Sequence, residues 1–504
     1  MIVSESLEGL RSKVEQVVEG FNACGMKLNP AKCCVLALDR VPKRKTLFVG
    51  GTRTFAPICI DGIEVPFMPA DGMYKYLGLK FGPRGMIKGY EFDLLKLKVT
   101  RLAKSALKPQ QKLFLFRNQL VPSLYHVLVL GGVARTTLAR MDSYCRREVR
   151  KFLHLPGDVP SAAIHASIRY GGLGIPDLAT TIPLHRARRT ARLCSSEDPL
   201  LRSVFLIGHI SHRLDGFCRL PKLDGIEILD RNMQNDSWKG QLHSKVDGGG
   251  LSQHGLCPQF DQWLTDPGMK IRGFEFVQAL HTRLGCLLTP SRASRGRGPP
   301  SGRFCTRDDQ IASLNHIAQH CQNTHGLRVD RHDQVVAMVQ ETLARKGRRT
   351  IKEPIIPIGN SWLKPDLVSL SKNKKEILIL DPQICSATRL LKLEDVHKAK
   401  VAKYSSKELI AGCVEKLMGK DFKGKLDARV FGVVISNRGT VPESTRRLLL
   451  SLLGKRMCAY VVLRVLSLTA RMTDVYMKRT HLSRRPARRH EGRGRDGIVA
   501  VGHG

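Results

Sequence analysis

The spacing of apolar residues predicts short helices and strands at the front of the chain. Six apolar residues recur at three- and four-residue steps and predict a first helix: Leu7, Leu10, Val14, Val17, Val18 and Phe21. Ser4 or Ser6 can cap this helix, and Gly25 stands where a C-terminal glycine belongs. Short strands follow at residues 35–38, 46–49, 57–65 and 76–79, with Asp61-Gly62 as a hairpin turn. No element before the first helix could pair with it, so we expect the chain to begin inside a domain.

The middle of the chain, from about residue 90 to 206, has a mostly helical pattern. Lys108-Pro109-Gln110 opens one helix that extends to Leu124, and a second helix covers residues 136–153. Residues 207–290 alternate short apolar runs with Gly and Asp, which indicates a mixed helical linker. Residues 290–303 are rich in Arg, Gly, Pro and Ser, so we expect a flexible basic connector and a domain boundary there.

The back of the chain has an α/β pattern. Helices are predicted at residues 310–320, 333–346 and 394–404, with a Leu-rich helix after Pro442. Strands are predicted at residues 367–370, 377–380 and 429–436. Residues 478–504 are basic and low in apolar residues, and we expect them to be disordered.

Composition narrows the function classes. The 504 residues carry a formal charge of +39, and 42% of them are hydrophobic, which excludes wholesale disorder. A charge of this size needs a polyanion, and nucleic acid is the first expectation. No run approaches the roughly 18 apolar residues of a membrane span, and the start lacks the features of a signal peptide, so no membrane partner is expected. The 14 scattered cysteines indicate a reducing compartment.

Two successive helices in the middle of the chain are rich in basic residues. A single such helix is equally well explained as a solvated face. Two in succession favour a groove that follows the phosphates of a nucleic acid. The candidate nucleic-acid-binding residues are Arg146, Arg147, Arg150, Arg188 and Arg189.

A pair of aspartates in the back of the chain carries the sharpest chemical signal. Asp366 opens one predicted strand, and Asp381 ends the next strand after four aliphatic residues. Carboxylates at such strand ends can hold Mg²⁺ while leaving water ligands in place. Lys400 and Tyr404 lie four residues apart on the following helix, where a lysine could stabilise charge on a phosphate. The alternative is that Asp366 belongs to a turn and that Asp381 only terminates a strand.

A second group of residues has spacing typical of a zinc knuckle. Its members are Cys305, Asp308, His316 and Cys321. A structural zinc site uses four thiolate or imidazole ligands, so Asp308 departs from the pattern. His320 or His325 could substitute as a ligand, and the alternative is a set of buried side chains without a metal.

These motifs resemble a known family. The run from His316 to His325, the sequence Lys364-Pro365-Asp366, Asp381 and the run from His397 to Tyr404 are similar to the C-terminal half of the pol protein of site-specific non-LTR retrotransposons. The family is the class with a restriction-enzyme-like endonuclease, typified by elements that insert into ribosomal RNA genes. Residues 25–32 and 74–78 resemble the later part of its polymerase palm, and residues 108–189 its thumb.

The resemblance implies a multidomain α+β and α/β architecture. Its parts would be a truncated reverse-transcriptase palm at 1–90, a helical thumb at 91–206, a linker at 207–303, a degenerate zinc knuckle at 304–330, a restriction-like PD-(D/E)XK-type endonuclease at 331–477 and a basic tail at 478–504. The chain starts just downstream of the family's paired polymerase aspartates, so we expect no DNA synthesis by this chain alone, and we expect it to be a partial sequence or a truncated copy.

The resemblance also implies the site residues and partners. Asp366 and Asp381 would bind Mg²⁺, Lys400 would be catalytic with Tyr404 in support, and Zn²⁺ would bind the knuckle if Asp308 substitutes for cysteine. Arg331 and His332 look like the family's basic pair next to the nuclease, in contact with DNA. The implied process is target-primed reverse transcription in the nucleus, on chromosomal DNA and with the element's RNA. The alternative is a decayed, non-catalytic remnant that binds RNA or DNA.

Overall fold

The computed structural model describes most of the chain. The described residues are 2–40, 47–49, 57–69, 71–82, 85–199, 201, 203, 219–253, 258–295, 300–386, 388, 391–422, 424 and 426–480. The tail predicted to be disordered therefore lies outside them after residue 480. The chain forms two compact units, each built from separate stretches. The first unit comprises Met1–Ser105, Asn118–Cys145 and Asp177–Arg231, and the second comprises Ala106–Arg117, Arg146–Pro176 and Asn232–Gly504.

The first unit begins with the predicted helix and several short strands. The elements are α1 (Leu7–Ala23), β1 (Leu38–Arg40), β2 (Leu47–Val49), β3 (Cys59–Ile60), β4 (Ile63–Glu64), β5 (Tyr74–Tyr76), β6 (Leu79–Gly82) and β7 (Gly85–Met86). The Ser6 side chain caps α1 by accepting a hydrogen bond from Gly9 N. The predicted strand at 76–79 is wrong, because Leu77 and Gly78 form the turn between β5 and β6 with φ angles of 46° and 83°.

Helices make up the rest of the first unit and its continuation into the second. They are α2 (Glu91–Lys104), α3 (Pro109–Leu115), α4 (Tyr125–Leu130), α5 (Arg135–Phe152), α6 (Ser161–His165) and α7 (Leu178–Cys194), with the ribbon β8 (Lys222–Leu223) and β9 (Ile226–Glu227) after them. The helix predicted at 136–153 is confirmed as α5. The single helix predicted from Lys108 to Leu124 is wrong: α3 passes into a π-turn (Phe116–Leu120) and a 3-10 turn (Pro122–Leu124). Pro122 lacks the amide hydrogen that a regular helix needs.

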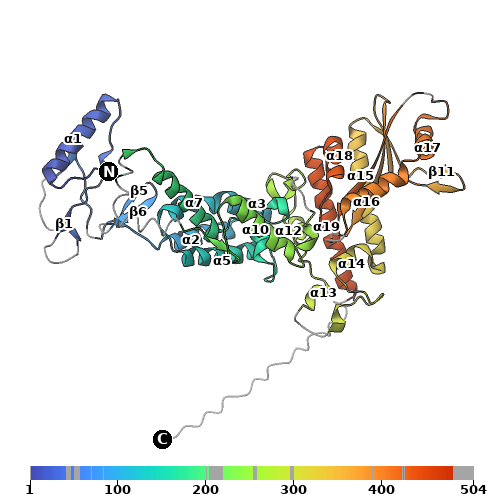
Figure 1. Cartoon of the computed structure of the whole chain (residues 1–504), viewed down its shortest axis with the longest axis horizontal. Coiled ribbons are helices and arrows are strands. Elements are labelled where there is room, and N and C mark those ends of the chain that lie inside the picture. The colour runs from blue at the N-terminus through green and yellow to red at the C-terminus, as the bar shows by residue number, and fades with distance from the viewer. Residues whose placement is uncertain are drawn as a thin grey trace, which may run out of the picture. The chain divides into compact units, whose positions relative to one another are not determined.

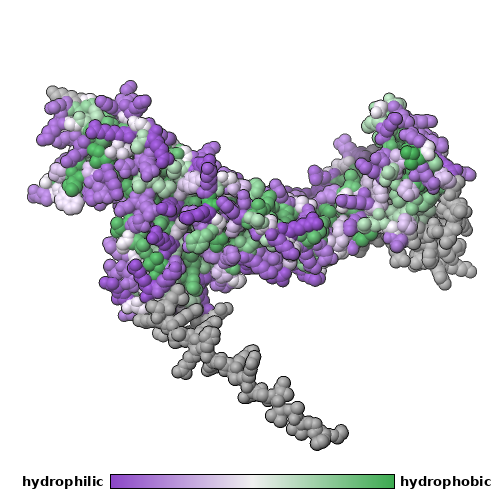
Figure 2. All heavy atoms as spheres, turned by 180° about the vertical axis from the view of Figure 1, so that it is seen from behind, coloured by the Kyte–Doolittle hydropathy of each residue, from purple (hydrophilic) through white to green (hydrophobic). Residues whose placement is uncertain are grey.

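The stretch Pro109–Leu130 is long and apolar enough to cross a membrane by length and composition alone. This finding corrects the prediction that no run of the chain is long enough. The core helix of a soluble protein meets the same criterion, and five apolar residues of this stretch are fully buried: Leu113, Phe116, Val121, Leu124 and Leu128. Hydrophilic residues cover most of the molecular face that Figure 2 shows.

The second unit contains a helical body; the sequence predicted its part up to residue 303 as a mixed helical linker, and α14 (Leu314–Gln319) as the helix at 310–320. Its other elements are α10 (Arg231–Ser244), α11 (Gln262–Thr265), α12 (Gly273–Leu284) and α13 (Pro290–Ala293). Trp263 is fully buried against Phe276, with ring centroids 5.8 Å apart. Next to them, Arg283 forms a buried ion pair with Asp261 at 3.1 Å. Packing of this kind requires α11 and α12 to be folded.

The predicted flexible connector at 290–303 is also wrong in its first part. Arg292 of α13 is buried and pairs with Asp158 at 2.7 Å and with Asp247 at 2.6 Å. Arg295 pairs with Asp247 as well, at 2.8 Å. Residues 296–299 lie outside the described residues. The charges of Arg292 and Arg295 are therefore balanced within the protein and are not free for a polyanion.

A four-stranded sheet and its helices form the C-terminal part of the second unit, coloured yellow to red in Figure 1. The elements are α15 (His325–Arg345), β10 (Arg349–Lys352), β11 (Ile356–Ile358), β12 (Ser361–Leu363), β13 (Leu367–Leu370), β14 (Glu376–Cys385), α16 (Leu393–Tyr404), α17 (Lys407–Met418), β15 (Asp427–Ser436), α18 (Glu443–Leu453) and α19 (Lys455–Thr480). The sheet order is β10-β13-β14-β15, and β11 and β12 form a separate hairpin. The first three strands are antiparallel, and β15 is parallel to β14.

One face of this sheet is buried by the helices that connect β14 to β15. Val368, Ile377 and Ile379 pack with Leu409 and Leu417 of α17 in one apolar cluster. Side chains alternate between the faces of a strand, so Asp381 of β14 points to the same side as Ile377 and Ile379. This is the side on which α16 lies.

Arg331 of α15 is a structural residue in this arrangement. It is 2% exposed, and its guanidinium donates hydrogen bonds to Thr469 Oγ1 of α19 at 2.8 Å and to Ala318 O of α14 at 2.9 Å. Burial lowers its pKa to about 9. This position argues against the predicted DNA contact of Arg331, because its donors are used inside the protein.

We predict that Arg331→Ala lowers the free energy of unfolding by about 2–5 kcal/mol, because it leaves a cavity and two unpaired polar groups. Arg189→Ala, at an exposed position of α7, should change it by no more than about 0.5 kcal/mol. Urea denaturation followed by circular dichroism measures both values. An Arg331→Ala protein that is as stable as the parent but binds DNA more weakly would contradict the structural role.

Candidate metal and nucleic-acid sites

The two aspartates predicted to bind a metal stand opposite each other on neighbouring strands. Leu367 of β13 pairs with Leu380 of β14 in the antiparallel register, so the next pair of positions is Asp366 and Asp381. Asp381 is 3% exposed, and the Asp366 side chain is 20% exposed. Asp381 does not end its strand as predicted: β14 continues to Cys385 because all ten of its residues pair with β15.

The surroundings of Asp381 combine burial with charges of both signs. Burial, followed by the negative charge of Asp366, raises the pKa of Asp381, while Lys400 and Tyr404 act to lower it. Lys400 Nζ forms an ion pair with Asp381 Oδ2. The sequence predicted that Lys400 would approach the two aspartates from the following helix, and the structure brings these three side chains together.

A glycine in β15 provides the space that Lys400 occupies. Gly432 is the partner of Asp381 in the parallel register. A Cβ atom at Gly432 would lie 2.7 Å from Lys400 Cβ and 3.2 Å from His397 O. The His397 ring also donates from Nδ1 to Gly432 O at 2.8 Å. Helix α16 can therefore pack close enough to present Lys400 to Asp381 only because residue 432 has no side chain.

Tyr404 and Glu353 hold the segment that leads to Asp366. Tyr404 is 2% exposed, and its hydroxyl donates to Lys364 O at 3.4 Å. Burial, with the charge of Asp381, raises the pKa of Tyr404, so its phenol stays neutral. Glu353 donates its backbone N–H to Asp366 O at 3.0 Å, and its carboxylate pairs with Lys364.

His332 of α15, predicted to lie next to the nuclease and to contact DNA, contacts Asp366 itself, a pairing that the sequence did not predict. Its Nε2 lies 3.1 Å from Asp366 Oδ2 and 3.1 Å from Pro382 O, and its Nδ1 lies 3.3 Å from Asp333 Oδ1. Acceptors at both ring nitrogens favour the imidazolium form. The hydrogen bond to Asp366 is the main cause that raises the pKa of His332 to about 9.

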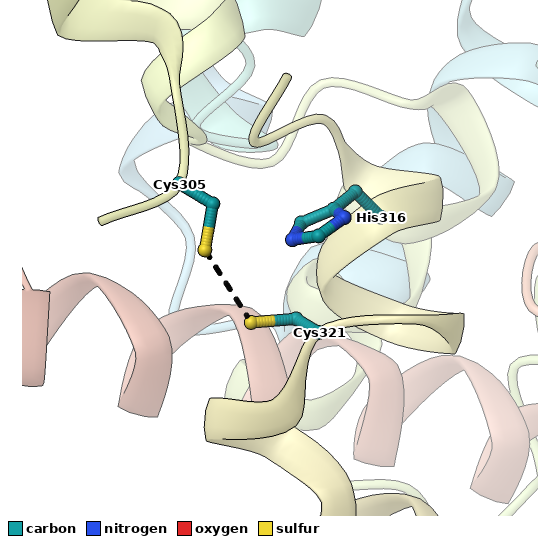
Figure 3. A group of neighbouring side chains, drawn as sticks. All are labelled: Cys305, His316 and Cys321. Atoms are coloured by element: carbon teal, nitrogen blue, oxygen red, sulfur yellow. Dashed lines mark hydrogen bonds between the residues drawn. The ribbon is translucent and has the colours of Figure 1, made fainter. Parts of the chain in front are cut away.

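A different cluster joins the predicted zinc ligands. Ligand atoms of Cys305, His316 and Cys321 all lie within 4.8 Å of one another, and their side chains converge in Figure 3. The two Sγ atoms are 3.7 Å apart. Two thiolates held at about 2.3 Å by one tetrahedral Zn²⁺ would be about 3.8 Å apart, so the observed spacing suits that ion.

Asp308, the fourth predicted ligand, lies beside this cluster but is not one of the residues whose ligand atoms all lie within 4.8 Å of one another. Asp308 Oδ2 lies 3.5 Å from His316 Nε2. His316 Nε2 is buried and makes no hydrogen bond to the described residues. Burial raises the pKa of Cys321 to about 11, so without a metal this thiol stays protonated. A metal ion bound here would have to displace that proton, and ligation by Asp308, which lies near His316, stays a prediction.

The five arginines predicted to bind nucleic acid lie in different surroundings. Arg150 is half-buried and donates to Val159 O at 2.8 Å, and Arg146 lies 3.2 Å from His165 Nε2. Arg147 is exposed and pairs with Glu148 at 3.1 Å. Arg188 and Arg189 are exposed. Nucleic-acid binding by this set stays a prediction, and the exposed members are the ones that a phosphate could reach.

Of the residues that sequence reasoning missed, Gly432 had a readable signal. A glycine inside the strand pattern at 429–436 indicates close approach of another backbone. The pairing of His332 with Asp366 had none, because α15 and β13 are separated along the chain by β10 and the β11–β12 hairpin.

We predict that histidine-selective NMR titration of the metal-free protein gives a pKa of about 9 for His332, above the ordinary value of 6.5. The pairing stabilises the fold fully below pH 6.5, and its contribution is lost as the pH rises through about 9. Asp366→Asn should return this pKa toward 6.5, whereas Asp395→Asn, at an exposed position of α16, should not. An unchanged His332 pKa in Asp366→Asn would contradict the pairing.

Comparison with known proteins places the chain among its relatives. It is 31% identical over 414 residues to the retrovirus-related Pol polyprotein from the type-2 retrotransposable element R2DM of Drosophila melanogaster, covering 81% of this chain and 38% of that protein. It is 28% identical over 411 residues to the Pol polyprotein from the type-1 element R2 of Nasonia vitripennis, with coverage of 81% and 38%. For an R2 Pol polyprotein of Popillia japonica the identity is 28% over 428 residues, with coverage of 84% of each chain.

The chain spans about two-fifths of the length of the first two of these relatives. No protein-family model matches it. The predicted resemblance to the pol proteins of non-LTR retrotransposons is confirmed by these identities over about four-fifths of the chain. The chain is a homologue of the Pol polyproteins of R2 retrotransposable elements.

Proposed function

We propose that the chain carries a Mg²⁺-dependent DNA endonuclease centred on Asp366, Asp381 and Lys400. The observation that supports this most strongly is the cross-strand pair of carboxylates with a lysine from the neighbouring helix in contact with one of them. The order of α15, three antiparallel strands, α16 with α17, and a parallel β15 supports a restriction-like domain of the PD-(D/E)XK type.

The donor set fits a hard divalent cation. Asp366 and Asp381 would supply its carboxylate ligands, because oxygen ligands of this kind are what Mg²⁺ prefers. A cation there would offset the repulsion between two carboxylates, which His332 and Lys400 offset in part. Bound Mg²⁺ would supply Lewis-acid chemistry at the phosphodiester and lower the pKa of a water nucleophile.

The residues of the chain have distinct parts in phosphodiester hydrolysis. Lys400 Nζ, placed at Asp381, would bind a non-bridging phosphate oxygen and stabilise the charge that grows there. His332 would hold Asp366 in its orientation through the 3.1 Å hydrogen bond. Tyr404, kept neutral by burial, would hold the Lys364 backbone just before Asp366. Each of these contacts limits the freedom of a group that must act on the phosphate.

The proposal extends to the biology that the relatives indicate. Homologues named as Pol polyproteins of retrotransposable elements support a role in target-primed reverse transcription. In that process the nuclease would nick chromosomal DNA in the nucleus, and the element's RNA would be copied from the exposed end. A palm and thumb derived from a reverse transcriptase would form the front of the chain, with its exposed arginines binding nucleic acid.

We predict that the purified protein nicks supercoiled plasmid with Mg²⁺ and not with EDTA. Asp366→Ala should slow nicking by about a hundredfold or more, because a lost carboxylate ligand removes several kcal/mol of charge stabilisation. Asp395→Asn is the matched control and should nick at the parental rate. Equal nicking by Asp366→Ala would refute the site assignment, and DNA binding without Mg²⁺-dependent cleavage would favour the non-catalytic remnant.

We also propose that Cys305, Asp308, His316 and Cys321 hold a structural Zn²⁺. The protein purified from zinc-containing medium should contain about one zinc ion per chain by plasma mass spectrometry. Cys321→Ser should lose most of it, whereas Cys194→Ser, which changes an exposed cysteine of α7, should retain it. A Cys321→Ser protein with undiminished zinc would refute this ligand set.

A further inference from the structure

The hairpin formed by β11 and β12 has two faces of different character. Ile356 of β11 is 1% exposed and packs toward α17, where a Cβ atom at Gly412 would meet its Cγ2 at 2.4 Å. The opposite face is exposed and apolar. Trp362 is 63% exposed, and Ile355, one residue before β11, is 58% exposed. Pro357 is exposed and is the register partner of Trp362, so the two rings share the outer face.

Trp362 is by far the most exposed tryptophan of the described residues. The sequence has three tryptophans. Trp238 is 8% exposed and Trp263 is fully buried, each within the helical body of the second unit. A large aromatic ring that stays exposed forgoes the favourable free energy that its burial would give. Such side chains are concentrated at binding surfaces.

The hairpin leads directly into the candidate nuclease site. The chain runs from Trp362 through Leu363, Lys364 and Pro365 to Asp366. Four residues of extended chain span at most about 14 Å, which corresponds to about four base-pair steps of DNA. The Glu353–Lys364 ion pair and the Tyr404 hydrogen bond fix the base of the hairpin beside that site.

Basic residues lie at the base of the hairpin and at the ends of α16 and of α17, the helix that packs against Ile356 of β11. Lys352 and Lys364 share the single carboxylate of Glu353, at 3.8 Å from Lys352. Lys403, at the end of α16, and Lys407, at the start of α17, are exposed. Cations around an exposed aromatic ring are the combination that binds the phosphates and a base of one nucleic-acid strand. The same charges would repel a second copy of this chain, whose net charge is +39.

We propose that the outer face of the β11–β12 hairpin binds an unstacked base of a DNA strand, with Trp362 stacking on that base and Lys364 near its phosphate. The inference rests on the proposed nuclease only for the choice of DNA as the strand that passes Asp366. In this proposal the hairpin binds the DNA strand next to the cleaved phosphate, a contact that the metal site does not itself supply.

Intrinsic fluorescence of the full-length protein tests this contact without any cleavage. The protein carries Asp366→Asn and is kept in buffer without Mg²⁺, and a 20-nucleotide single-stranded DNA of mixed sequence is the probe. DNA should quench the fluorescence of Trp362, and Trp362→Phe should abolish the quenching while keeping the affinity for DNA within about threefold. Trp362→Ala should weaken DNA binding by about fivefold to a hundredfold, the range that stacking of one base on an aromatic ring contributes.

A control and the possible outcomes separate this inference from the proposed function. Ile226→Ala removes an apolar side chain that is 58% exposed on the β8–β9 ribbon and should leave DNA affinity unchanged. Unquenched fluorescence, or full DNA affinity in Trp362→Ala, overturns the inference even if the parent protein nicks DNA. If DNA quenches the fluorescence but the parent protein does not nick plasmid with Mg²⁺, the inference is supported and only the proposed nuclease activity is refuted. Quenching by RNA of the same sequence but not by DNA, or loss of a dimer in Trp362→Ala without loss of DNA binding, also overturns it.

Discussion

The structure of the site depends on one constraint: two carboxylates are held opposite each other on adjacent strands, and one of them is buried. The β13–β14 register places Asp366 against Asp381, and burial and mutual repulsion raise the pKa of Asp381. Such an arrangement persists only where positive charge offsets the repulsion. His332 from α15 and Lys400 from α16 supply that charge from two separate helices.

The surrounding elements can be understood as ways of bringing those two cations to the carboxylates. Gly432 lets α16 pack against β15 closely enough for Lys400 to reach Asp381. Arg331, the neighbour of His332, fixes α15 to α14 and α19 and so helps to set where His332 lies. Two arginines have a similar structural use, since Arg283 and Arg292 pair with buried or half-buried aspartates. Because each such pair contributes no net charge, the +39 comes from the excess of basic over acidic residues elsewhere in the chain.

Local pattern in the sequence was enough to predict the main elements of the sheet and its helices. Periodicity found α5, α16 and the buried strands, and motif spacing brought together Asp366, Asp381 and Lys400 as well as the cysteine cluster. Local pattern gave wrong predictions where the conformation or burial of a residue depends on contacts between distant segments. Leu77-Gly78 looks apolar enough for a strand, but positive φ angles make it a turn. Arg331 and Arg292 look like surface charges, and only the packing around them shows that they are buried.

Metal binding by the carboxylate pair is the central claim, and calorimetric titration with Mn²⁺ measures it most directly. Mn²⁺ accepts the same oxygen ligands as Mg²⁺. The metal-free protein should bind Mn²⁺ in a saturable event that is lost in Asp381→Asn and retained in Asp333→Asn, whose carboxylate contacts only the outer nitrogen of His332. Identical titrations for the parent protein and Asp381→Asn would contradict the proposed site.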